Sequence, residues 1–328
     1  MTKKALVTGG AGFIGSHLCE ELLARGFSVT AVDDLSTGCM DNIQHLLGNP
    51  KFFFRKASVL DRRKTAPFVA GCDLVYHLAA AVGVLLILDK PLQSILTNIE
   101  GTKTVLDLAS RYRKKVVFAS SSEVYGKHST GAMKEDDDRV MGPTSVSRWT
   151  YAASKALDES LALAYSKEKK LRVVILRFFN VVGPRQMGRY GMVFPRFIQA
   201  ALDGRPITVY GDGSQVRSFT YVKDAVRAAA QLGLSKKAEG GIFNVGNDEP
   251  VSINRLAKEV KRKTASSSKI VRAPYKSYYG DLFEDAMYRL PDITRMRKTI
   301  GYRPHYRLSR ALDETIAYFK KTPKDKRR

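Results

Sequence analysis

Residues 8–15 read Thr8-Gly9-Gly10-Ala11-Gly12-Phe13-Ile14-Gly15, and this stretch decides the fold. An apolar run, Ala5-Leu6-Val7, precedes it, and an amphipathic stretch from Ser16 to Ala24 follows it. The order is therefore a strand, a glycine turn and a helix. Free N–H groups at the start of such a helix, together with the helix dipole, favour a pyrophosphate there. The stretch predicts the opening of a dinucleotide-binding unit.

Each glycine of the pattern has its own predicted role. Gly9 permits the tight turn, Gly12 lets the backbone approach the pyrophosphate, and Gly15 lets the helix pack close to the strand. The next predicted strand, Ser28–Val32, ends just before Asp33. A carboxylate there can accept hydrogen bonds from both hydroxyls of an adenosine ribose and repels a 2′-phosphate. We therefore expect NAD as the cofactor, in preference to NADP.

Strand-like and helical patterns alternate up to about residue 177. The predicted strands are Lys4–Thr8, Ser28–Val32, Phe52–Lys56, Leu74–His77, Lys115–Ala119 and Arg172–Leu176, and the predicted helices are 13–25, 62–69, 92–112 and 149–169. This alternation predicts an α/β fold with a Rossmann-type, doubly wound parallel sheet. We expect residues 1–177 to form the NAD-binding domain.

The last third is less regular and is predicted to form a smaller, interleaved substrate domain. Residues 178–328 make up most of it, and some of their segments return to the first domain. Its predicted elements are two short strands, Ile207–Tyr210 and Gly241–Val245, and helices at 192–203, 252–263 and 308–320. The basic tail Lys320–Arg328 is expected to be disordered.

The composition excludes several classes of protein. The chain has 328 residues, of which 44% are hydrophobic, which is ample for a core. Its longest apolar run, Leu78 to Leu88, is too short to span a bilayer, and no signal peptide is visible. Three cysteines without metal or redox spacing, and five scattered histidines, predict reduced thiols and no metal site. We expect a cytoplasmic protein without membrane insertion.

The formal net charge of +23 is unusual. A surface this basic attracts polyanions and phosphorylated substrates. The basic clusters are dispersed along the chain, however, and they are not interleaved with aromatic residues. We therefore interpret them as a solvated surface and expect no specific nucleic-acid binding.

A second region with chemical potential lies between residues 115 and 155. A predicted buried strand ends in Ser120-Ser121-Ser122-Glu123-Val124-Tyr125-Gly126, at the edge where α/β sheets bind ligands. Further on, Tyr151-Ala152-Ala153-Ser154-Lys155 places Tyr151 and Lys155 one turn apart on one helix face. An ammonium group lowers the pKa of a nearby phenol, so the tyrosine can act as a general base toward a sugar hydroxyl.

Together these motifs resemble the extended short-chain dehydrogenase/reductases, of the NAD-dependent nucleotide-sugar epimerase/dehydratase family. The resemblance spans about residues 4 to 320 and rests on the glycine turn, Asp33, Tyr76–Ala80, Asn98, the serine cluster, Tyr151–Lys155, Arg177–Asn180, Gly183–Arg185 and Tyr210–Ala225. It implies an enzyme that oxidises a sugar at C4, acts on the 4-keto intermediate and often returns the hydride. It also implies a homodimer joined through the helices at about 92–112 and 149–169.

The resemblance also implies the site residues. The catalytic candidates are Ser121, Glu123, Tyr151 and Lys155, with Ser122 as a further candidate. The implied cofactor-binding residues are Gly9, Gly12, Phe13, Ile14, Gly15, Asp33, Ser58, Val59, Leu78, Ala79, Ala80, Asn98, Tyr151 and Lys155. The implied substrate-binding residues are Ser121, Asn180, Arg185, Arg217 and Arg289. One departure is Ala57-Ser58-Val59, where the family usually has Gly-Asp followed by Val or Leu. Adenine recognition is expected to be weaker there, although Ser58 can still hydrogen-bond.

Glu123 discriminates between branches of the family. Simple UDP-galactose 4-epimerases usually have small residues or Thr there, whereas UDP-glucuronate decarboxylases carry Ser-Glu, as in Ser122-Glu123. The decarboxylases also resemble this chain at 147–151 and at 278–292, where an arginine in the position of Arg289 meets the glucuronate carboxylate. The segment 188–192 differs from typical decarboxylases.

Three readings of the function follow. The first is a UDP-glucuronate decarboxylase, and the alternative is a 4-epimerase of UDP-glucose or UDP-glucuronate, in which Glu123 is a buried structural carboxylate. A catalytically silent binding protein is the third reading, motivated by the charge. The intact set of Ser121, Tyr151 and Lys155 argues against it.

Overall fold

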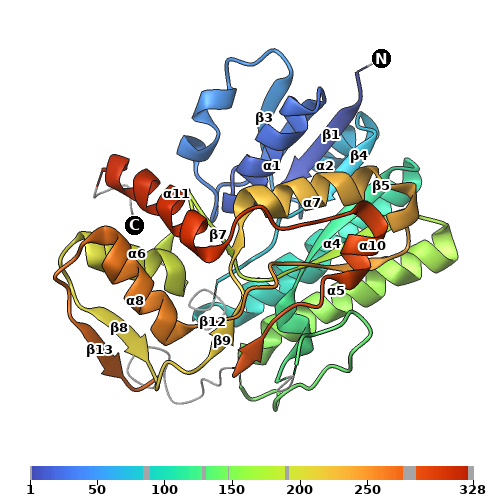
Figure 1. Cartoon of the computed structure of the whole chain (residues 1–328). Helices are drawn as coiled ribbons and strands as arrows, with labels where there is room; N and C mark the ends of the chain where they lie inside the picture. Colours follow the sequence, from blue (N-terminus) through green and yellow to red (C-terminus); the bar gives the residue numbers. More distant parts are fainter. Residues whose placement is uncertain are drawn as a thin grey trace.

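The computed structural model describes residues 2–83, 89–127, 131–146, 148–188, 192–275 and 286–323. Its centre is a parallel sheet of seven strands in the order β11-β6-β5-β4-β1-β2-β3 (Figure 1). The strands are β1 (Lys4–Thr8), β2 (Ser28–Asp33), β3 (Phe52–Lys56), β4 (Leu74–His77), β5 (Lys115–Ser121), β6 (Val173–Phe178) and β11 (Ile242–Val245). The strand order reverses between β1 and β4, which is where such sheets bind ligands. The predicted α/β fold is confirmed.

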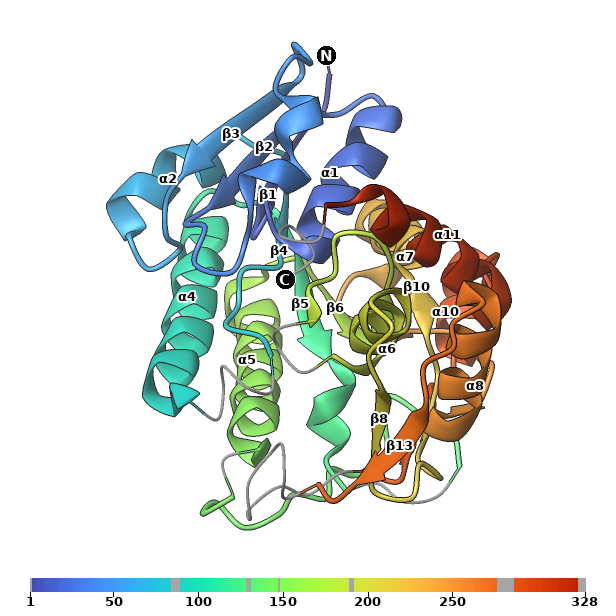
Figure 2. The same cartoon turned by 90° about the vertical axis from the view of Figure 1, so that its left-hand side faces the viewer.

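Helices cover both faces of this sheet (Figure 2). On one face α1 (Phe13–Ala24) and α7 (Val222–Leu234) pack against the strands in one apolar core. On the other face α2 (Arg62–Ala70), α4 (Pro91–Arg111) and α5 (Arg148–Lys169) share a second core with the sheet. Strands buried between two helical layers must be apolar on both sides, and every residue of β6 is buried.

The smaller part of the molecule lies beyond the carboxyl ends of the strands. It contains α6 (Val193–Leu202), α8 (Ile253–Thr264) and α11 (Leu308–Lys321), which enclose a third core. Its strands form small sheets that pair β7 (Val181–Val182) with β10 (Thr220–Tyr221), β8 (Ile207–Tyr210) with β13 (Ile270–Ala273), and β9 (Val216–Arg217) with both β12 (Val251–Ser252) and β14 (Tyr288–Arg289). Short helical segments are η1 (Met40–Asn42), η2 (Gln44–Leu46), η3 (Ser122–Tyr125), η5 (Lys236–Ala238) and α10 (Thr294–Ile300).

Several parts of the sequence prediction differ from the structure, beginning with six short strands, β7, β9, β10, β12, β13 and β14, that were not predicted. The sequence predicted no helix at α7 or α10, although α7 packs directly on α1. The prediction of disorder from Lys320 onward was wrong for Lys320 and Lys321, because both belong to the last turn of α11. That turn is held by Phe319, which is buried, and basic residues there favour the helix dipole. The remaining tail, 324–328, lies outside the described residues, as do Ser147 and the segments 84–88, 189–191 and 276–285.

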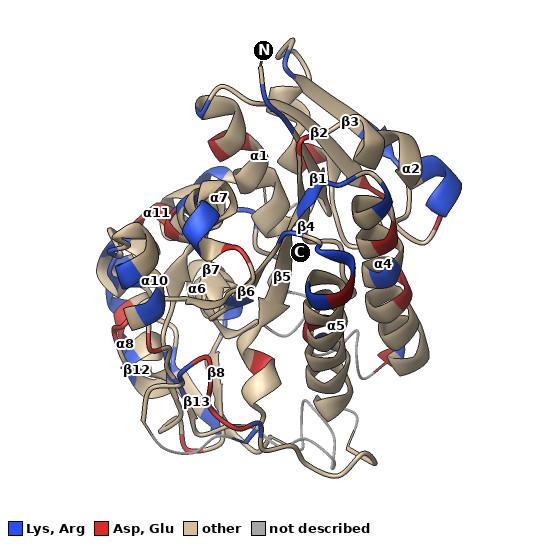
Figure 3. Cartoon of the chain, turned by 90° about the vertical axis from the view of Figure 1, so that its right-hand side faces the viewer, with Lys and Arg blue, Asp and Glu red and all other residues tan. Residues whose placement is uncertain are grey.

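The excess of basic residues in the sequence is distributed over the surface of the protein (Figure 3). Lys and Arg are spread over α2, α4, α7, α8 and α10, so that no single element carries the basic charge (Figure 3). Cys19, Cys39 and Cys72 are free thiols, and burial raises the pKa of Cys72 to about 11. In the part of the chain that the structure describes, no helix has the length and apolar character needed to cross a bilayer.

Candidate active site

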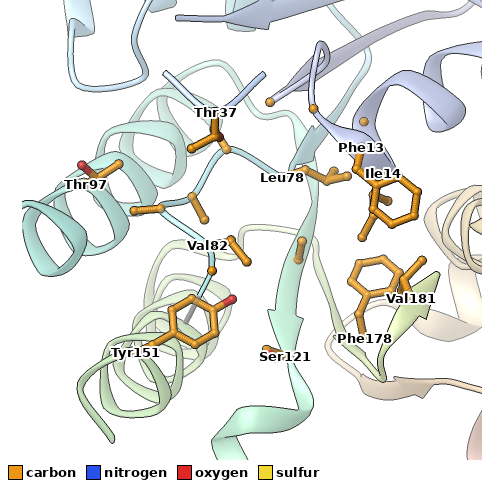
Figure 4. Close-up of a pocket in the computed structure, with 18 of the residues that line it drawn as sticks. Phe13, Ile14, Thr37, Leu78, Val82, Thr97, Ser121, Tyr151, Phe178 and Val181 are labelled. Atoms are coloured by element: carbon orange, nitrogen blue, oxygen red, sulfur yellow. The ribbon is translucent and has the colours of Figure 1, made fainter. Parts of the chain in front are cut away.

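A cavity of about 640 Å³ opens at the carboxyl ends of the central strands, at the point where the strand order reverses. Residues of the predicted cofactor site line one part of it, namely Gly9, Gly12, Phe13, Ile14, Gly15, Asp33, Ser58, Val59, Leu78, Ala79 and Ala80 (Figure 4). Residues of the predicted catalytic and substrate sites line the rest, namely Ser121, Ser122, Glu123, Tyr151, Lys155, Asn180, Arg185 and Arg289. The fold thus brings together residues from opposite ends of the chain.

The glycine turn leaves no room for side chains at two positions. Gly9 has a positive φ of 71°, and a Cβ there would stand 2.8 Å from the backbone nitrogen of Ala79. A Cβ on Gly15 would stand 2.0 Å from the carbonyl oxygen of Gly9. The backbone between β1 and α1 therefore stays bare beside the cavity, which is the cradle that a pyrophosphate requires.

Asp33 ends β2 with its carboxylate beside this turn. One carboxylate oxygen accepts a hydrogen bond from the backbone N–H of Ala11 at 2.9 Å, and the other accepts from the N–H of Leu35 at 2.8 Å. Burial raises the pKa of Asp33, and these N–H groups oppose the rise. The carboxylate is thus held in one orientation on the cavity wall, where it can receive ribose hydroxyls.

Tyr151 and Ser121 face the same space from different elements. The ring of Tyr151 projects from α5 toward β5, where Ser121 lies at the end of the strand (Figure 4). Ser121 Oγ accepts a hydrogen bond from the N–H of Glu123 at 3.2 Å. This bond caps the start of η3, where the chain turns toward the cavity. The local sequence Ser-Ser-Glu therefore builds the rim of the site from a strand end and a capped turn.

The predicted lowering of the Tyr151 pKa was wrong for the protein alone. Burial raises the pKa of Tyr151, the negative charge of Glu123 raises it further, and the hydrogen bond with Ser121 only partly opposes the rise. Lys155 Nζ lies 3.5 Å from Asp158, so the lysine's charge is offset by a closer carboxylate. The sequence argument counted the lysine and left out both the desolvation and the carboxylates.

Glu123 and Arg289 form an ion pair on the wall of the cavity. Arg289 donates hydrogen bonds from both terminal nitrogens to the two oxygens of Glu123, one of them at 3.2 Å. The Arg289 side chain is 5% exposed and that of Glu123 is 20% exposed. A bidentate arginine is the geometry that proteins use to hold carboxylates, so this guanidinium is preorganised for an acid group.

The other predicted substrate residues lie in different settings. Asn180 lines the cavity, and its amide donates to the carbonyl of Ser218 at 3.0 Å. Arg185 also lines it, but its guanidinium binds Glu20 and Ser16 on α1. Although burial raises the Glu20 pKa, a hydrogen bond from His17 and the charge of Arg185 lower it to about 2.

Two predicted residues stand behind the cavity wall. Asn98 is buried, and its side chain accepts from the N–H of Ala81 at 2.8 Å and donates to Ser154. Arg217 is buried on β9, in register with Arg289 on β14, and donates to the carbonyl of Val216. Both support residues that line the cavity, and neither lines it.

The sequence prediction missed one wall of the cavity. Lys90, Gln93, Ser94 and Thr97 line it from the start of α4. Their spacing of three, four and seven residues places them on one helix face, which is a pattern visible in the sequence beside Asn98. In the described ranges, no cluster of three or more His, Cys, Asp or Glu side chains could hold a metal ion.

Several known proteins have sequences similar to this chain. The sequence profile of the NAD dependent epimerase/dehydratase family matches residues 5–246. A UDP-N-acetyl-alpha-D-glucosaminuronate decarboxylase of Bacillus cytotoxicus is 44% identical over 326 residues, which cover 99% of this chain and 100% of that protein. A UDP-glucuronic acid decarboxylase 1 of Xenopus tropicalis is 34% identical, over 97% of this chain and 72% of that protein.

A solved structure is similar over nearly the whole length. The UDP-glucuronic acid 4-epimerase of Bacillus cereus, in complex with UDP-glucuronic acid and NAD, superposes with a TM-score of 0.87 and is 32% identical. The superposition covers 97% of this chain and 99% of the epimerase. The resemblance inferred from the motifs is confirmed, and so is NAD as the cofactor. The chain is an enzyme that belongs to the NAD dependent epimerase/dehydratase family.

Proposed function

We propose that this enzyme decarboxylates a UDP-linked hexuronate, with UDP-glucuronate as its first candidate substrate, through transient oxidation of the sugar at C4. The observation that carries the proposal is the Glu123–Arg289 pair beside Tyr151 and Ser121. Apart from the pairing with Glu123, a neutral sugar gives no reason to place a guanidinium on this wall. A hexuronate does, because its C6 carboxylate needs a bidentate partner.

The residues of the first part of the chain fit NAD. The bare turn at Gly9 and Gly15 would hold the pyrophosphate, and Asp33 would accept the adenosine ribose hydroxyls. Ser58 and Val59 line the adenine end, and Tyr151 and Lys155 line the other end. Bound there, the cofactor supplies a hydride acceptor.

Proton transfer falls to the residues at the end of β5 and on α5. Tyr151 takes the proton of the sugar 4-hydroxyl, and Ser121 orients that hydroxyl. Lys155 supplies positive charge to a tyrosine whose pKa burial has raised. Asn180, Arg185 and, from behind, Arg217 provide the charge and hydrogen bonds for the UDP diphosphate.

Loss of CO₂ follows from the chemistry of the oxidised sugar. A ketone at C4 makes the C6 carboxylate part of a β-keto acid, so the C5–C6 bond breaks with its electrons passing toward the C4 oxygen. Arg289 takes up the substrate carboxylate in place of Glu123, and C5 is then protonated, with Ser122 and a Glu123 that has left Arg289 and gained a proton as the candidates on this wall. Return of the hydride to C4 gives a UDP-pentose.

A 4-epimerase is the second candidate. The Bacillus cereus structure supports it, since a 4-epimerase of UDP-glucuronic acid has this fold at 32% identity. An epimerase must keep the carboxylate from leaving and must let the keto sugar turn over in the site. The decarboxylase named among the relatives at 44% identity supports the first candidate and adds a 2-acetamido hexuronate to the substrates that require testing.

The test is incubation of the purified enzyme with UDP-glucuronate, UDP-N-acetylglucosaminuronate and UDP-glucose, followed by mass spectrometry and NMR. Decarboxylation is expected to remove the mass of CO₂ from a hexuronate. An unchanged mass with an inverted C4 signal identifies the epimerase instead. Arg289→Lys serves as the matched variant: it is expected to raise the KM for the hexuronate about tenfold or more, because lysine cannot form the bidentate pair.

We also propose that the enzyme is a homodimer joined through α4 and α5. These two helices lie side by side (Figure 2), and Leu92, Leu96, Leu157 and Leu163 on them are exposed. Exposed leucines on a pair of packed helices are typical of a surface that another helix covers. Light scattering of the wild type and of Leu157→Arg tests this, with a monomeric variant expected. The free thiols favour a reducing compartment, and we place the enzyme in the cytoplasm.

A further inference from the structure

A buried carboxylate lies one helical turn beyond the catalytic lysine. Lys155 Nζ is 3.5 Å from Asp158 Oδ2, and the two side chains are 3% and 0% exposed. By strict geometry neither oxygen of Asp158 has a hydrogen-bond partner among the described residues, and the donors beside it are Thr102 and Lys155. Buried carboxylates are normally hydrogen-bonded, because an ionised group that loses water needs compensation. The charge of Asp158 thus depends on Lys155 and Thr102 for compensation.

Other charged groups around Lys155 are already neutralised. Glu159, the next residue, is held by Arg177 through hydrogen bonds of 2.7 to 3.2 Å. His77, at the end of β4, is neutral, since burial first and the charge of Lys155 second lower its pKa to about 3. Among the described residues near Lys155, Asp158 is therefore the carboxylate that forms no ion pair with an arginine.

The rest of this environment is apolar or uncharged. Lys155 Nζ lies 4.4 Å from the centre of the Phe118 ring on β5. Thr102, on α4, lies beside Asp158 and contacts His77 Nε2 at 3.4 Å, and His77 Nδ1 contacts Thr8 at 2.8 Å. These contacts join β5, α4, β4 and β1 around Lys155 and Asp158, but they add no charged group to the pair.

The charge state of Lys155 depends on this arrangement. Burial lowers the pKa of Lys155, and Asp158 opposes that shift before any other group. Burial raises the pKa of Asp158 to about 6, so its carboxylate is mostly ionised at neutral pH. A neutral amine at residue 155 would give the Tyr151 phenolate no stabilisation.

We propose that Asp158 is a positioning residue that holds Lys155 as an ammonium ion next to Tyr151 while the tyrosine takes the sugar proton. Asp158 acts through Lys155 and touches neither sugar nor cofactor. The inference rests on the proposed C4 oxidation, and it applies equally to decarboxylation and to 4-epimerisation, since both begin with that step.

The test is the pH dependence of kcat with UDP-glucuronate for the wild type and Asp158→Asn. Removing the Asp158 anion lowers the pKa of Tyr151 and of Lys155. The acidic limb of the profile, set by Tyr151, and the alkaline limb, set by Lys155, are therefore both expected to move to lower pH, by about one unit. At alkaline pH the variant is expected to lose about tenfold or more in kcat, because Lys155 is no longer protonated there. A profile whose limbs stay in place overturns the inference.

Two further variants separate charge from structure. Asp158→Glu keeps the carboxylate and is expected to restore the wild-type profile. Glu135→Gln removes another buried carboxylate, one that accepts from the N–H of Asn244 at 2.9 Å and has no contact with Lys155. It is expected to lower thermal stability without moving the pH profile. An equal shift in Glu135→Gln would mean that the effect is a general one and would overturn the role of Asp158.

A readout without sugar keeps this inference independent of the proposed substrate. NADH binding, followed by fluorescence across the same pH range, reports on Lys155, which lines the cofactor cavity. Its pH dependence is expected to move to lower pH in Asp158→Asn, and coinciding curves would overturn the inference. If the wild type converts no UDP-sugar, the proposed function is wrong. The NADH titration alone then decides whether Asp158 holds Lys155 in its charged form. Asp158→Ser replaces Asp158→Asn if the asparagine variant lacks the wild-type circular dichroism spectrum.

Discussion

Arg289 donates hydrogen bonds from both terminal guanidinium nitrogens to the two carboxylate oxygens of Glu123, which lies 166 residues earlier in the chain. Glu123 follows β5 of the large sheet, whereas Arg289 belongs to the small sheet of β12, β9 and β14. The Nε of Arg289 has no hydrogen-bond partner in the described part of the protein. Because Glu123 occupies both terminal nitrogens, a substrate carboxylate can bind this guanidinium in two ways. It either shares the guanidinium with Glu123 or replaces Glu123.

Glu123→Gln is expected to separate oxidation of the sugar from release of CO₂. Glutamine keeps the shape of the side chain but loses the carboxylate that pairs with Arg289 and that can take up and release a proton. Release of CO₂ from UDP-glucuronate should fall about 10²-fold or more, and C4 oxidation should fall less. Absorbance of enzyme-bound NADH after mixing with substrate measures the difference. Normal turnover would remove Glu123 from the mechanism.

Tyr151→Phe is expected to abolish turnover with the fold and NAD binding intact. Only the phenolic oxygen is deleted, and a positioned base contributes about 10²–10⁴-fold. Ser121→Ala should slow the reaction less, because the serine orients the hydroxyl and does not keep its proton. Steady-state rates, with NAD content and circular dichroism as controls, decide the matter. Substantial activity in Tyr151→Phe would assign the base to another group.

Asp33→Ala is expected to weaken NAD binding by about 1–3 kcal/mol, the range for a charge-assisted hydrogen bond. NADP binding should weaken less or improve, because the repulsion of the 2′-phosphate is removed. Asp33 also holds the N–H groups of Ala11 and Leu35, so Asp33→Asn is the control that keeps the shape and removes the charge. Fluorescence titration with both cofactors measures the preference, and equal NAD and NADP affinity in the wild type would contradict the assignment.

Glu159→Gln is expected to destabilise the protein by about 3–5 kcal/mol. Glu159 accepts hydrogen bonds from Arg177 on β6 and from Ser120 on β5 at 2.5 Å, and all three side chains are buried. Loss of its charge leaves a buried guanidinium without a counterion. Denaturant unfolding measures the free-energy change, with Glu259→Gln on the exposed face of α8 as a surface control. A loss below about 1 kcal/mol would show that the pair does not support the sheet.

The basic surface is expected to bind nucleic acid weakly and without sequence preference. Its lysines and arginines are distributed over many helices (Figure 3), whereas a single-strand platform gathers basic and stacking aromatic side chains in one groove. Affinity for an oligonucleotide should fall steeply with salt. A sequence-selective complex that survives physiological salt, measured by fluorescence anisotropy, would contradict this interpretation.

Sequence reasoning located the large sheet because its signals are local. The strands β1, β3 and β4 have the bounds that the sequence predicted, since each is an apolar run closed by a turn. The helix α7 was missed because it follows two short strands without a side-chain cap, and most of its residues are buried. Its apolar character comes from contact with α1 and the sheet, which is a tertiary property.

The candidate site shows the same division. The spacing of Tyr151 and Lys155 predicted that both would reach one cavity, and they do. The raised pKa of Tyr151 was not predictable from spacing, because it depends on how much water the fold removes and on where Glu123 lies. The buried position of Asp158 was equally invisible, since a lysine and an aspartate three residues apart are usually an exposed pair.

The register of β14 against β9, which pairs Arg289 with Arg217, has a consequence for synthesis on the ribosome. The glycine turn, Asp33, Tyr151 and Lys155 all belong to the first half of the polypeptide, whereas β6, α7 and β11, which complete the sheet and the core around them, follow in the second half. The acid-binding arginine arrives only with the last strand and closes a contact of very long sequence separation. Such contacts form late, because their loop-closure entropy is lost before they are made. Under the proposed function, the guanidinium that meets the sugar acid is therefore the last part of the site to be synthesised, after the residues proposed to bind the coenzyme.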